Sequence, residues 1–181
     1  MIRAMTASTR IALPDPALVV LVGAAGAGKS TFAARHFLPG EVLSSDAFRE
    51  RISGDAADQR ATTAAFAALH RELGRRLERG RLTVVDATNV TRRARRALLA
   101  IAADHGVPAV AIVLEPPAET VLARNAARRE RVVPDPAVRS HLRELEATLV
   151  PGGLEAEGFA LVVRLPSPDA LDEARVERQR S

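Results

Sequence analysis

Of the 26 lysines and arginines in this 181-residue chain, only one is a lysine, and it lies in a glycine-rich loop. The loop reads G-x-x-x-x-G-K-S, and we predict that its residues surround nucleotide phosphates: Gly23, Ala24, Ala25, Gly26, Ala27, Gly28, Lys29, Ser30 and Thr31. Backbone N–H groups of such a loop face the phosphates, and the compact ammonium contacts the β- and γ-phosphates. The Ser30 hydroxyl is suited to ligate Mg²⁺. The motif therefore predicts binding of ATP, or another NTP, with Mg²⁺.

Asp46 is the candidate general base for an acceptor hydroxyl. It follows a predicted strand at 41–44, and strand carboxyl ends line the ligand crevice of an open α/β sheet. Arg49 comes one helical turn later, near the same face, where it can hold an anionic group of the acceptor. In the alternative interpretation, Asp46 only caps a short helix. The spacing alone supports both interpretations equally.

Asp86 ends a second apolar stretch, Leu82-Thr83-Val84-Val85. A carboxylate in this position is typical of a residue that holds Mg²⁺ directly or through water. The residues after it, Thr88 to Thr91, are also suited to a turn and a helix cap. We favour the role near the metal.

Arg124 and Arg128 are spaced i, i+4, so both project from one face of a predicted helix. Two guanidinium groups closing over the phosphates would neutralise charge on a transferred phosphoryl group. A solvated basic stripe is the alternative in a chain so rich in arginine. The same ambiguity applies to a second group, which we expect to form a solvated face: Arg92, Arg93, Arg95 and Arg96.

Strand and helix patterns alternate along the chain, which predicts an α/β fold. The expected strands are 18–22, 41–44, 82–86, 108–114 and 159–165, and the expected helices are 31–36, 46–52, 60–78, 92–104, 116–124 and 136–149. Repeated β-α units imply a parallel sheet of four or five strands with helices on both faces, as in P-loop NTPases and kinases. An arginine-rich lid is expected at 128–136. We expect one domain over 1–181, with a flexible stretch at 1–9 and a tail at 166–181, in which Leu171 and Val176 dock one helical turn.

Composition limits the class of protein. Hydrophobic residues make up 47% and charged residues 27%, which is ordinary for a globular domain. No apolar run approaches the roughly 20 residues that span a bilayer, and no signal peptide is recognisable. The chain has no cysteine, which fits a reducing compartment. We therefore expect a soluble cytoplasmic protein without membrane contact. The net charge of +4 permits nucleic-acid binding without requiring it.

Taken together, several segments resemble the 5′-hydroxyl polynucleotide kinase domain. The likeness is closest to the N-terminal kinase module of bacterial polynucleotide kinase-phosphatase-ligase RNA repair proteins, and it runs from about Leu18 to Gln179. The segments that carry it are 23–32, 43–46, 58–59, 82–90 and Arg124-Asn125 with Arg128 and Arg131. Their order and spacing are more specific than any one of them.

The resemblance implies an enzyme that transfers the γ-phosphate of an NTP to the 5′-OH end of RNA or DNA. It implies that Asp46 activates the 5′-OH and that Arg49 binds a phosphate of the acceptor strand, with Gln59 and Thr62 lining the acceptor side. Lys29, Ser30, Arg124 and Arg128 would contact the donor phosphates or their Mg²⁺.

The chain also departs from the larger members of that family. It carries no D-x-D-G-T phosphatase motif, and no second lysine is available as a ligase nucleophile. We expect a kinase alone, either free-standing or the first domain of a longer chain that also carries phosphatase and ligase modules. Two other functions remain open: a small-metabolite P-loop kinase, and a nucleotide-binding regulatory module without transferase activity.

Overall fold

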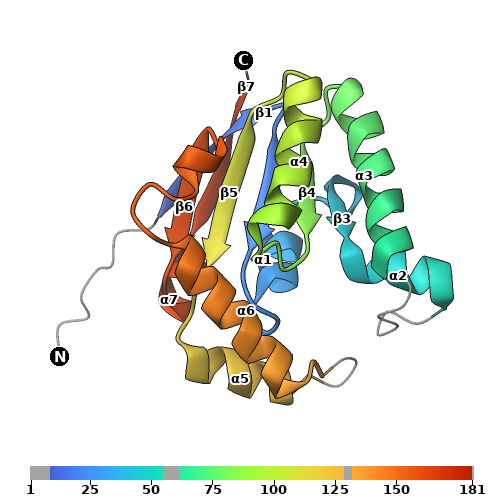
Figure 1. The fold of residues 1–181 in the computed structure, drawn as a ribbon. Coiled ribbons are helices and arrows are strands. Elements are labelled where there is room, and N and C mark those ends of the chain that lie inside the picture. Colours follow the sequence, from blue (N-terminus) through green and yellow to red (C-terminus); the bar gives the residue numbers. More distant parts are fainter. Residues whose placement is uncertain (1–8, 55–61, 129–131, 181) are drawn as a thin grey trace.

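The computed structural model describes residues 9–54, 62–128 and 132–180. Its centre is a five-stranded parallel sheet with the strand order β3-β4-β2-β5-β6 (Figure 1). The strands are β2 (Leu18–Val22), β3 (Val42–Ser44), β4 (Thr83–Asp86), β5 (Ala109–Leu114) and β6 (Leu161–Leu165). The predicted α/β fold with a parallel sheet is confirmed.

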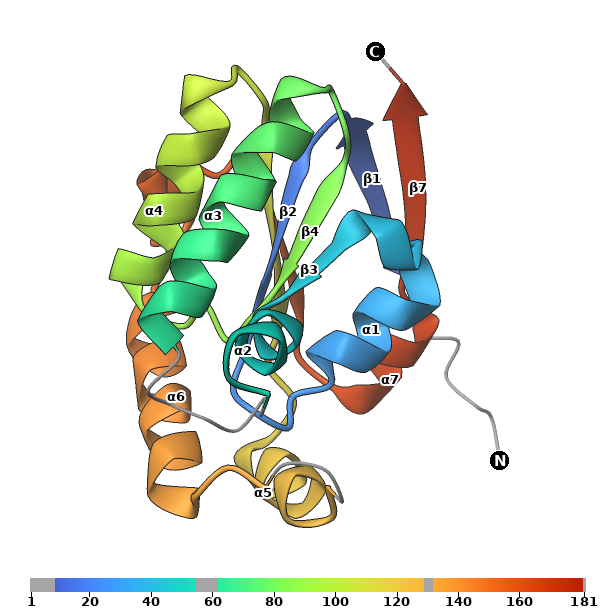
Figure 2. The same cartoon turned by 90° about the vertical axis from the view of Figure 1, so that its right-hand side faces the viewer.

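Helices cover both faces of this sheet (Figure 2). They are α1 (Lys29–His36), α2 (Ser45–Ser53), α3 (Thr62–Glu78), α4 (Arg92–Asp104), α5 (Ala118–Ala126), α6 (Asp135–Thr148) and α7 (Pro168–Glu173). Figure 2 shows α3 and α4 on one face of the sheet and α1 and α7 on the other. None of the helices in the described part of the chain has the length and apolar character that crossing a membrane requires.

The apolar core lies on both sides of the central strands. Every residue of β2 is buried, and its side chains alternate between two clusters. Leu18, Val20 and Val22 pack with the α3 and α4 side, whereas Val19 and Leu21 pack with the α1 side. A strand buried on both faces reads as a continuous apolar run, which is why the sequence identified it.

A second, two-stranded sheet was not expected. β1 (Arg10–Asp15) and β7 (Arg175–Arg180) pair in parallel, with Ile11 opposite Val176. Leu171 does lie in a helix, α7, but Val176 belongs to β7. The expectation of one helical turn in a tail was therefore wrong at Val176. Charged residues dominate β7, so its sequence carries almost no apolar alternation. Its pairing depends on the buried residues Ile11 and Leu13 of β1, which are distant from β7 in the sequence.

Arg95 also differs from its expected place on a solvated face, since only 1% of it is exposed. Its Nε and Nη2 donate to the two carboxylate oxygens of Glu157 at 2.8 and 2.7 Å. Its Nη1 donates to the carbonyls of Asn89 and Val90 at 3.0 and 2.7 Å. This bidentate, fully paired arginine fixes the connection between β4 and α4. Arg92, Arg93 and Arg96 are exposed, as predicted.

Candidate active site

The sequence motifs meet at the carboxyl edge of the parallel sheet. The glycine-rich loop connects β2 to α1, Asp86 is the last residue of β4, and α2 follows β3 directly. In open α/β sheets this edge is where ligands bind.

Backbone conformation explains the glycines of the loop. Gly26 and Gly28 have φ values of 91° and 101°, which L side chains rarely adopt. A Cβ atom on Gly26 would lie 2.5 Å from the carbonyl oxygen of Val121, so the loop also packs tightly against α5. Gly28 is the N-cap of α1 and has no side chain to cap its first turn. The N–H groups of that turn are therefore available to an anion.

Lys29 lies under this loop, with 8% of the residue exposed. Its Nζ donates hydrogen bonds to the carbonyl oxygens of Gly23 and Ala24, each at 2.8 Å. Burial lowers the pKa of Lys29 to about 8; nearby Asp86 raises it and Arg128 lowers it. A bound polyphosphate would favour the charged ammonium, because opposite charges stabilise the ionised form.

A cavity of about 260 Å³, which we call the phosphate cavity, lies at the phosphate loop. Its lining comes from the loop, the start of α1, and the end of α5 with the chain just after it: Gly26, Gly28, Lys29, Ser30, Thr31, Arg124 and Arg128. The two arginines and the loop, far apart in sequence, therefore face one space. A neighbouring cavity of about 270 Å³ shares Gly28, Thr31 and Arg124 and continues to Pro168 and Leu171 at α7.

Asn125 holds the segment that follows Arg128. The residue is fully buried, its Nδ2 donates to the carbonyl of Val133 at 2.7 Å, and its Oδ1 accepts from the N–H of Val133 at 3.1 Å. This pair of bonds ties the chain before α6 back onto α5. Residues 129–131 of the expected lid, including Arg131, lie outside the described residues.

A larger cavity of about 490 Å³ lies between α2, α3 and α6. It is lined by Ala25, Lys29, Ser30, Ser45, Asp46, Arg49, Thr62, Phe66, Asp86, Ala87, Thr88, Arg128, Val133, Pro134, Ala137 and His141. We refer to it as the acceptor cavity, because Asp46, Arg49 and Thr62, which the sequence assigned to an acceptor, line it. Lys29, Ser30 and Arg128 line both this space and the phosphate cavity.

Asp46 and Arg49 form an ion pair within α2, from Oδ1 of the aspartate to Nη2 of the arginine. Arg49 is 6% exposed, whereas the Asp46 side chain is 38% exposed. The N-cap of α2 is Ser44, whose Oγ accepts from the N–H of Ala47 at 3.4 Å. Asp46 is therefore not the residue that caps this helix.

Thr62 begins α3 and also lines the acceptor cavity. Its Oγ1 is buried and has no hydrogen-bond partner among the described residues. A buried hydroxyl without a partner is uncommon, and it can bond to a polar ligand in the cavity. Gln59, which the sequence placed beside Thr62, lies outside the described residues.

Sequence reasoning missed several residues of this cavity. Phe66, Pro134 and His141 were not considered as site residues. His141 lies within α6, where no motif surrounds it. Nothing in the local sequence marks these residues, since only the packing of α6 beside α2 and α3 brings them to the cavity.

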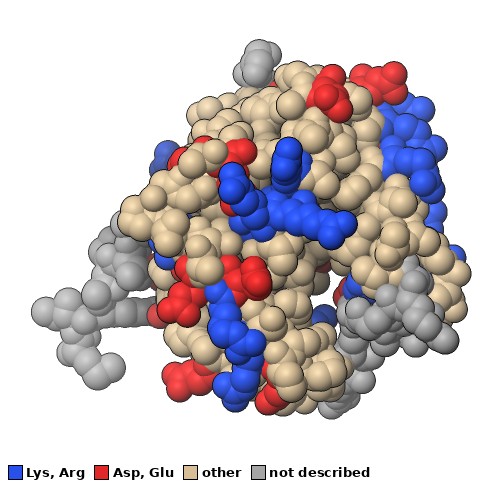
Figure 3. All heavy atoms as spheres, in the orientation of Figure 1, with Lys and Arg blue, Asp and Glu red and all other residues tan. Residues whose placement is uncertain are grey.

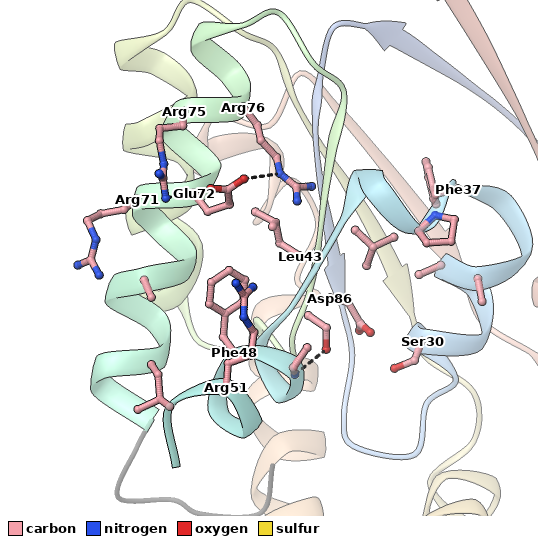
Figure 4. A pocket seen from close by; sticks show the side chains of 18 residues that line it. Ser30, Phe37, Leu43, Phe48, Arg51, Arg71, Glu72, Arg75, Arg76 and Asp86 are labelled. Atoms are coloured by element: carbon pink, nitrogen blue, oxygen red, sulfur yellow. Dashed lines mark hydrogen bonds and ion pairs between the residues drawn. The ribbon is translucent and has the colours of Figure 1, made fainter. Parts of the chain in front are cut away.

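Ser30 and Asp86 are the residues that could hold a metal ion. Both residues line the acceptor cavity, and both also line a second cavity on the other side of α2. In Figure 4 both face the same space at one end of the second cavity. A hydroxyl and a carboxylate suit Mg²⁺, which prefers oxygen ligands and keeps several of them as water or substrate phosphate. The donor set therefore fits the ion.

The second cavity is larger than the acceptor cavity, at about 930 Å³, and runs along β3 between α1 and α3 (Figure 4). Away from Ser30 and Asp86 it is lined by Phe48 and by arginines of α2 and α3. Two of these arginines, Arg75 and Arg76, pair with Glu72 at 3.0 Å. Asp46 and Arg49 do not line it, and both face the smaller acceptor cavity.

Comparison with known proteins places this arrangement among kinase-like P-loop folds. Residues 18–151 match the model of a protein family described as AAA domain. No curated protein matches the sequence.

Three solved structures illustrate the likeness. One is a structure of the Pnkp1/Rnl/Hen1 RNA repair complex, with 25% identity and a TM-score of 0.64 over 75% of this chain and 46% of that chain. Another is a sugar kinase from Janibacter sp. HTCC2649, with 26% identity, a TM-score of 0.56 and coverage of 87% and 91%. The third is Kti12 of Chaetomium thermophilum in complex with ADP-AlF3, with 17% identity, a TM-score of 0.63 and coverage of 86% and 92%.

This chain spans less than half the length of the matched chain in the RNA repair complex. By contrast, it and the sugar kinase cover most of each other. The fold implies nucleotide binding.

Proposed function

Because this chain belongs to the AAA-domain family and has a kinase-like P-loop fold, we propose that it is a polynucleotide 5′-hydroxyl kinase. It would transfer the γ-phosphate of ATP, or another NTP, to the 5′-OH end of RNA or DNA. The observation that carries the proposal is the Asp46–Arg49 pair, which faces the acceptor cavity together with Lys29 and Ser30.

The lining of the phosphate cavity supports a binding site for the NTP donor. N–H groups of the loop and of α1, with Lys29, would bind the β- and γ-phosphates, while Arg124 from α5 and Arg128 from the chain just after α5 would cover them. The base and ribose would extend toward α7 through the neighbouring cavity. Mg²⁺ held by Ser30 and Asp86 would neutralise phosphate charge as it develops.

On the acceptor side, Asp46 would act as the general base. Its carboxylate would accept the proton of the 5′-OH as the oxygen attacks the γ-phosphorus and the bond to the β-phosphate oxygen breaks. Arg49 would bind the first phosphate of the acceptor strand, and its ion pair with Asp46 keeps both groups directed at one place. In-line transfer of this kind depends mainly on positioning and charge neutralisation.

Buried charge favours an anionic acceptor over a neutral metabolite. Arg49 is almost completely buried, and a guanidinium in a cavity wall is well suited to bind phosphate. The likeness to a structure of an RNA repair complex supports the same choice. A small-metabolite kinase is the second candidate, because the sugar kinase has similar length and 26% identity.

We extend the proposal to the context of the reaction. The chain would act as one kinase domain over 1–181 in nucleic-acid end healing inside the cell, with phosphatase and ligase modules as partners. A 5′-phosphate is what a ligase requires, so such a kinase prepares broken ends for sealing.

Transfer of label from γ-labelled ATP to acceptors offered separately tests this function. We expect label on 5′-OH RNA or DNA oligonucleotides and on nucleoside 3′-monophosphates, but little on gluconate, neutral sugars or nucleosides. Label on a sugar or gluconate, with none on any oligonucleotide, would establish the second candidate instead. ATP binding without transfer to any acceptor would indicate a regulatory module.

Arg124→Ala and Arg128→Ala are each expected to lower the rate of transfer about 10²-fold. Both guanidinium groups line the phosphate cavity, where they would stabilise charge on the transferred phosphoryl group. Because both residues are exposed, thermal unfolding should be unchanged. Arg81→Ala, which removes an exposed arginine before β4, is the control and should retain the wild-type rate. Wild-type turnover in both variants would show that the two arginines form a solvated stripe.

A further inference from the structure

Three arginines on α4 have no role in the site described above. Arg92, Arg93 and Arg96 are exposed, and their side chains form no ion pair with any residue in the described ranges. Together with Leu99 and Glu157 they line a surface hollow of about 460 Å³. Glu157 is already bound on both oxygens by Arg95, so the hollow is strongly basic. We call Arg92, Arg93 and Arg96 the α4 basic surface.

The position of these charges is unfavourable for the helix itself. They lie in the first turns of α4, where the helix dipole is positive and where no acidic residue is present. Arg92 and Arg96 are also a like-charge pair at i, i+4. A bound anion would relieve both effects, because it would face three guanidinium groups and the positive end of the helix.

The α4 basic surface lies close to the acceptor cavity. Thr88 lines that cavity, and Thr91, three residues later, caps α4 with its Oγ1 accepting from the N–H of Ala94 at 3.3 Å. Arg92 is four positions after Thr88, and such a segment reaches at most about 14 Å. Arg95 holds the carbonyls of Asn89 and Val90 in this connection, which fixes the distance between the two sites.

The charge distribution over the molecule agrees with this placement. Figure 3 shows basic side chains gathered in the middle of one face, over α4, and the same face is hollowed below them. A strand whose 5′ end occupies the acceptor cavity between α3 and α6 could continue across this face toward α4. Its phosphates would then meet an unpaired cationic surface.

We propose that the α4 basic surface binds backbone phosphates of the acceptor polynucleotide, several nucleotides from the 5′ end that reacts. The inference rests on the proposed function and adds a second contact region to the same substrate. Leu99, which is half-buried in the hollow, offers an apolar contact to a sugar or base. Contacts of this kind strengthen binding regardless of sequence and depend on salt.

The test uses Arg92→Gln/Arg96→Gln, which removes two charges from the surface and also one like-charge pair within α4. The matched control is Arg79→Gln/Arg81→Gln, which removes two exposed arginines from the chain between α3 and β4, at the opposite edge of the sheet. Fluorescence anisotropy measures binding of single-stranded RNA and DNA of about 20 nucleotides, longer than a typical site of up to about 16 nucleotides. Each oligonucleotide carries a 5′-OH and a 3′ fluorophore.

The comparison uses whichever oligonucleotide, RNA or DNA, the wild-type protein binds with the higher affinity. We expect the α4 variant to bind it about 10-fold more weakly at low salt than the control variant does. The association constant decreases as the salt concentration rises, and the slope of its logarithm against log salt should be less steep by about 1.4 in the α4 variant. This value corresponds to two lost contacts, since each phosphate contact with a single strand contributes about 0.7. Equal affinity and equal slope in the two variants would overturn the inference.

Transfer assays separate this inference from the proposed function. With a dinucleotide acceptor, the α4 variant should have wild-type kcat and KM, whereas with the long oligonucleotide KM should rise about 10-fold. If no oligonucleotide is phosphorylated by the wild type, the proposed function fails, and the anisotropy result still decides whether the surface binds nucleic acid. A rise in KM for both acceptors alike would contradict a contact distant from the 5′ end.

Discussion

Lys29→Ala is expected to reduce phosphoryl transfer by 10³-fold or more, the largest loss of any single substitution in this chain. The ammonium is buried directly beneath the phosphate loop, where its Nζ donates hydrogen bonds to the carbonyls of Gly23 and Ala24. Single-turnover transfer from γ-labelled ATP measures the loss, with thermal unfolding as the check that the variant is folded.

Lys29→Arg tests whether shape as well as charge matters at this position. A planar guanidinium cannot replace a compact ammonium under a loop whose carbonyls lie 2.8 Å away, so we expect a loss of at least about 10². The chain uses arginine at every other strongly basic position. Near-normal activity of the arginine variant would contradict the idea that lysine is required here for its shape.

Asp46→Asn is expected to lower the rate of transfer to a 5′-OH end by about 10³, within the usual range for loss of a general base. Asparagine keeps the size of the side chain and an oxygen for Arg49, but it cannot accept the proton. Because Ser44 caps α2, the helix should persist. Affinity for ATP, measured by titration, should be little changed.

The competing explanation is that Asp46 serves only to neutralise the buried Arg49. Arg49→Gln separates the two roles. If Asp46 is the base, its substitution lowers kcat, whereas Arg49→Gln mainly raises KM for acceptors that carry a phosphate. If Asp46 serves only Arg49, the two variants should have the same defect, and the double variant should be no worse than either.

Much of the nucleotide side of the molecule could be predicted because it is encoded locally. The phosphate loop is contiguous, and a loop between β2 and α1 must lie at the carboxyl edge of a parallel sheet. Asp86 and α2 follow strands and so reach the same edge. The expectation that Arg124 and Arg128 share one helical face was wrong in detail, because α5 ends at Ala126 and Arg128 lies just beyond it. The structure still brings both side chains to one cavity with the loop.

Other features depend on contacts between distant segments and carry no local signal. The pairing of β1 with β7 joins the two ends of the described chain, and β7 is too highly charged to read as a strand. Arg95 looks like its exposed neighbours until Glu157 meets it across the fold. His141 reaches the acceptor cavity only because α6 packs beside α2 and α3. That Asp46 does not cap α2 likewise needed the position of Ser44.

The most direct test of the central claim is the position of the phosphate that the wild-type enzyme adds. The enzyme is incubated with γ-labelled ATP, Mg²⁺ and a mixture of a 5′-OH oligonucleotide and gluconate at equal concentration, and the products are separated after digestion of the oligonucleotide to 5′-mononucleotides. We predict that label appears in the 5′-terminal mononucleotide, with little in gluconate. Label in gluconate alone, or in no acceptor while ATP is bound, would contradict the assignment of a polynucleotide 5′-hydroxyl kinase.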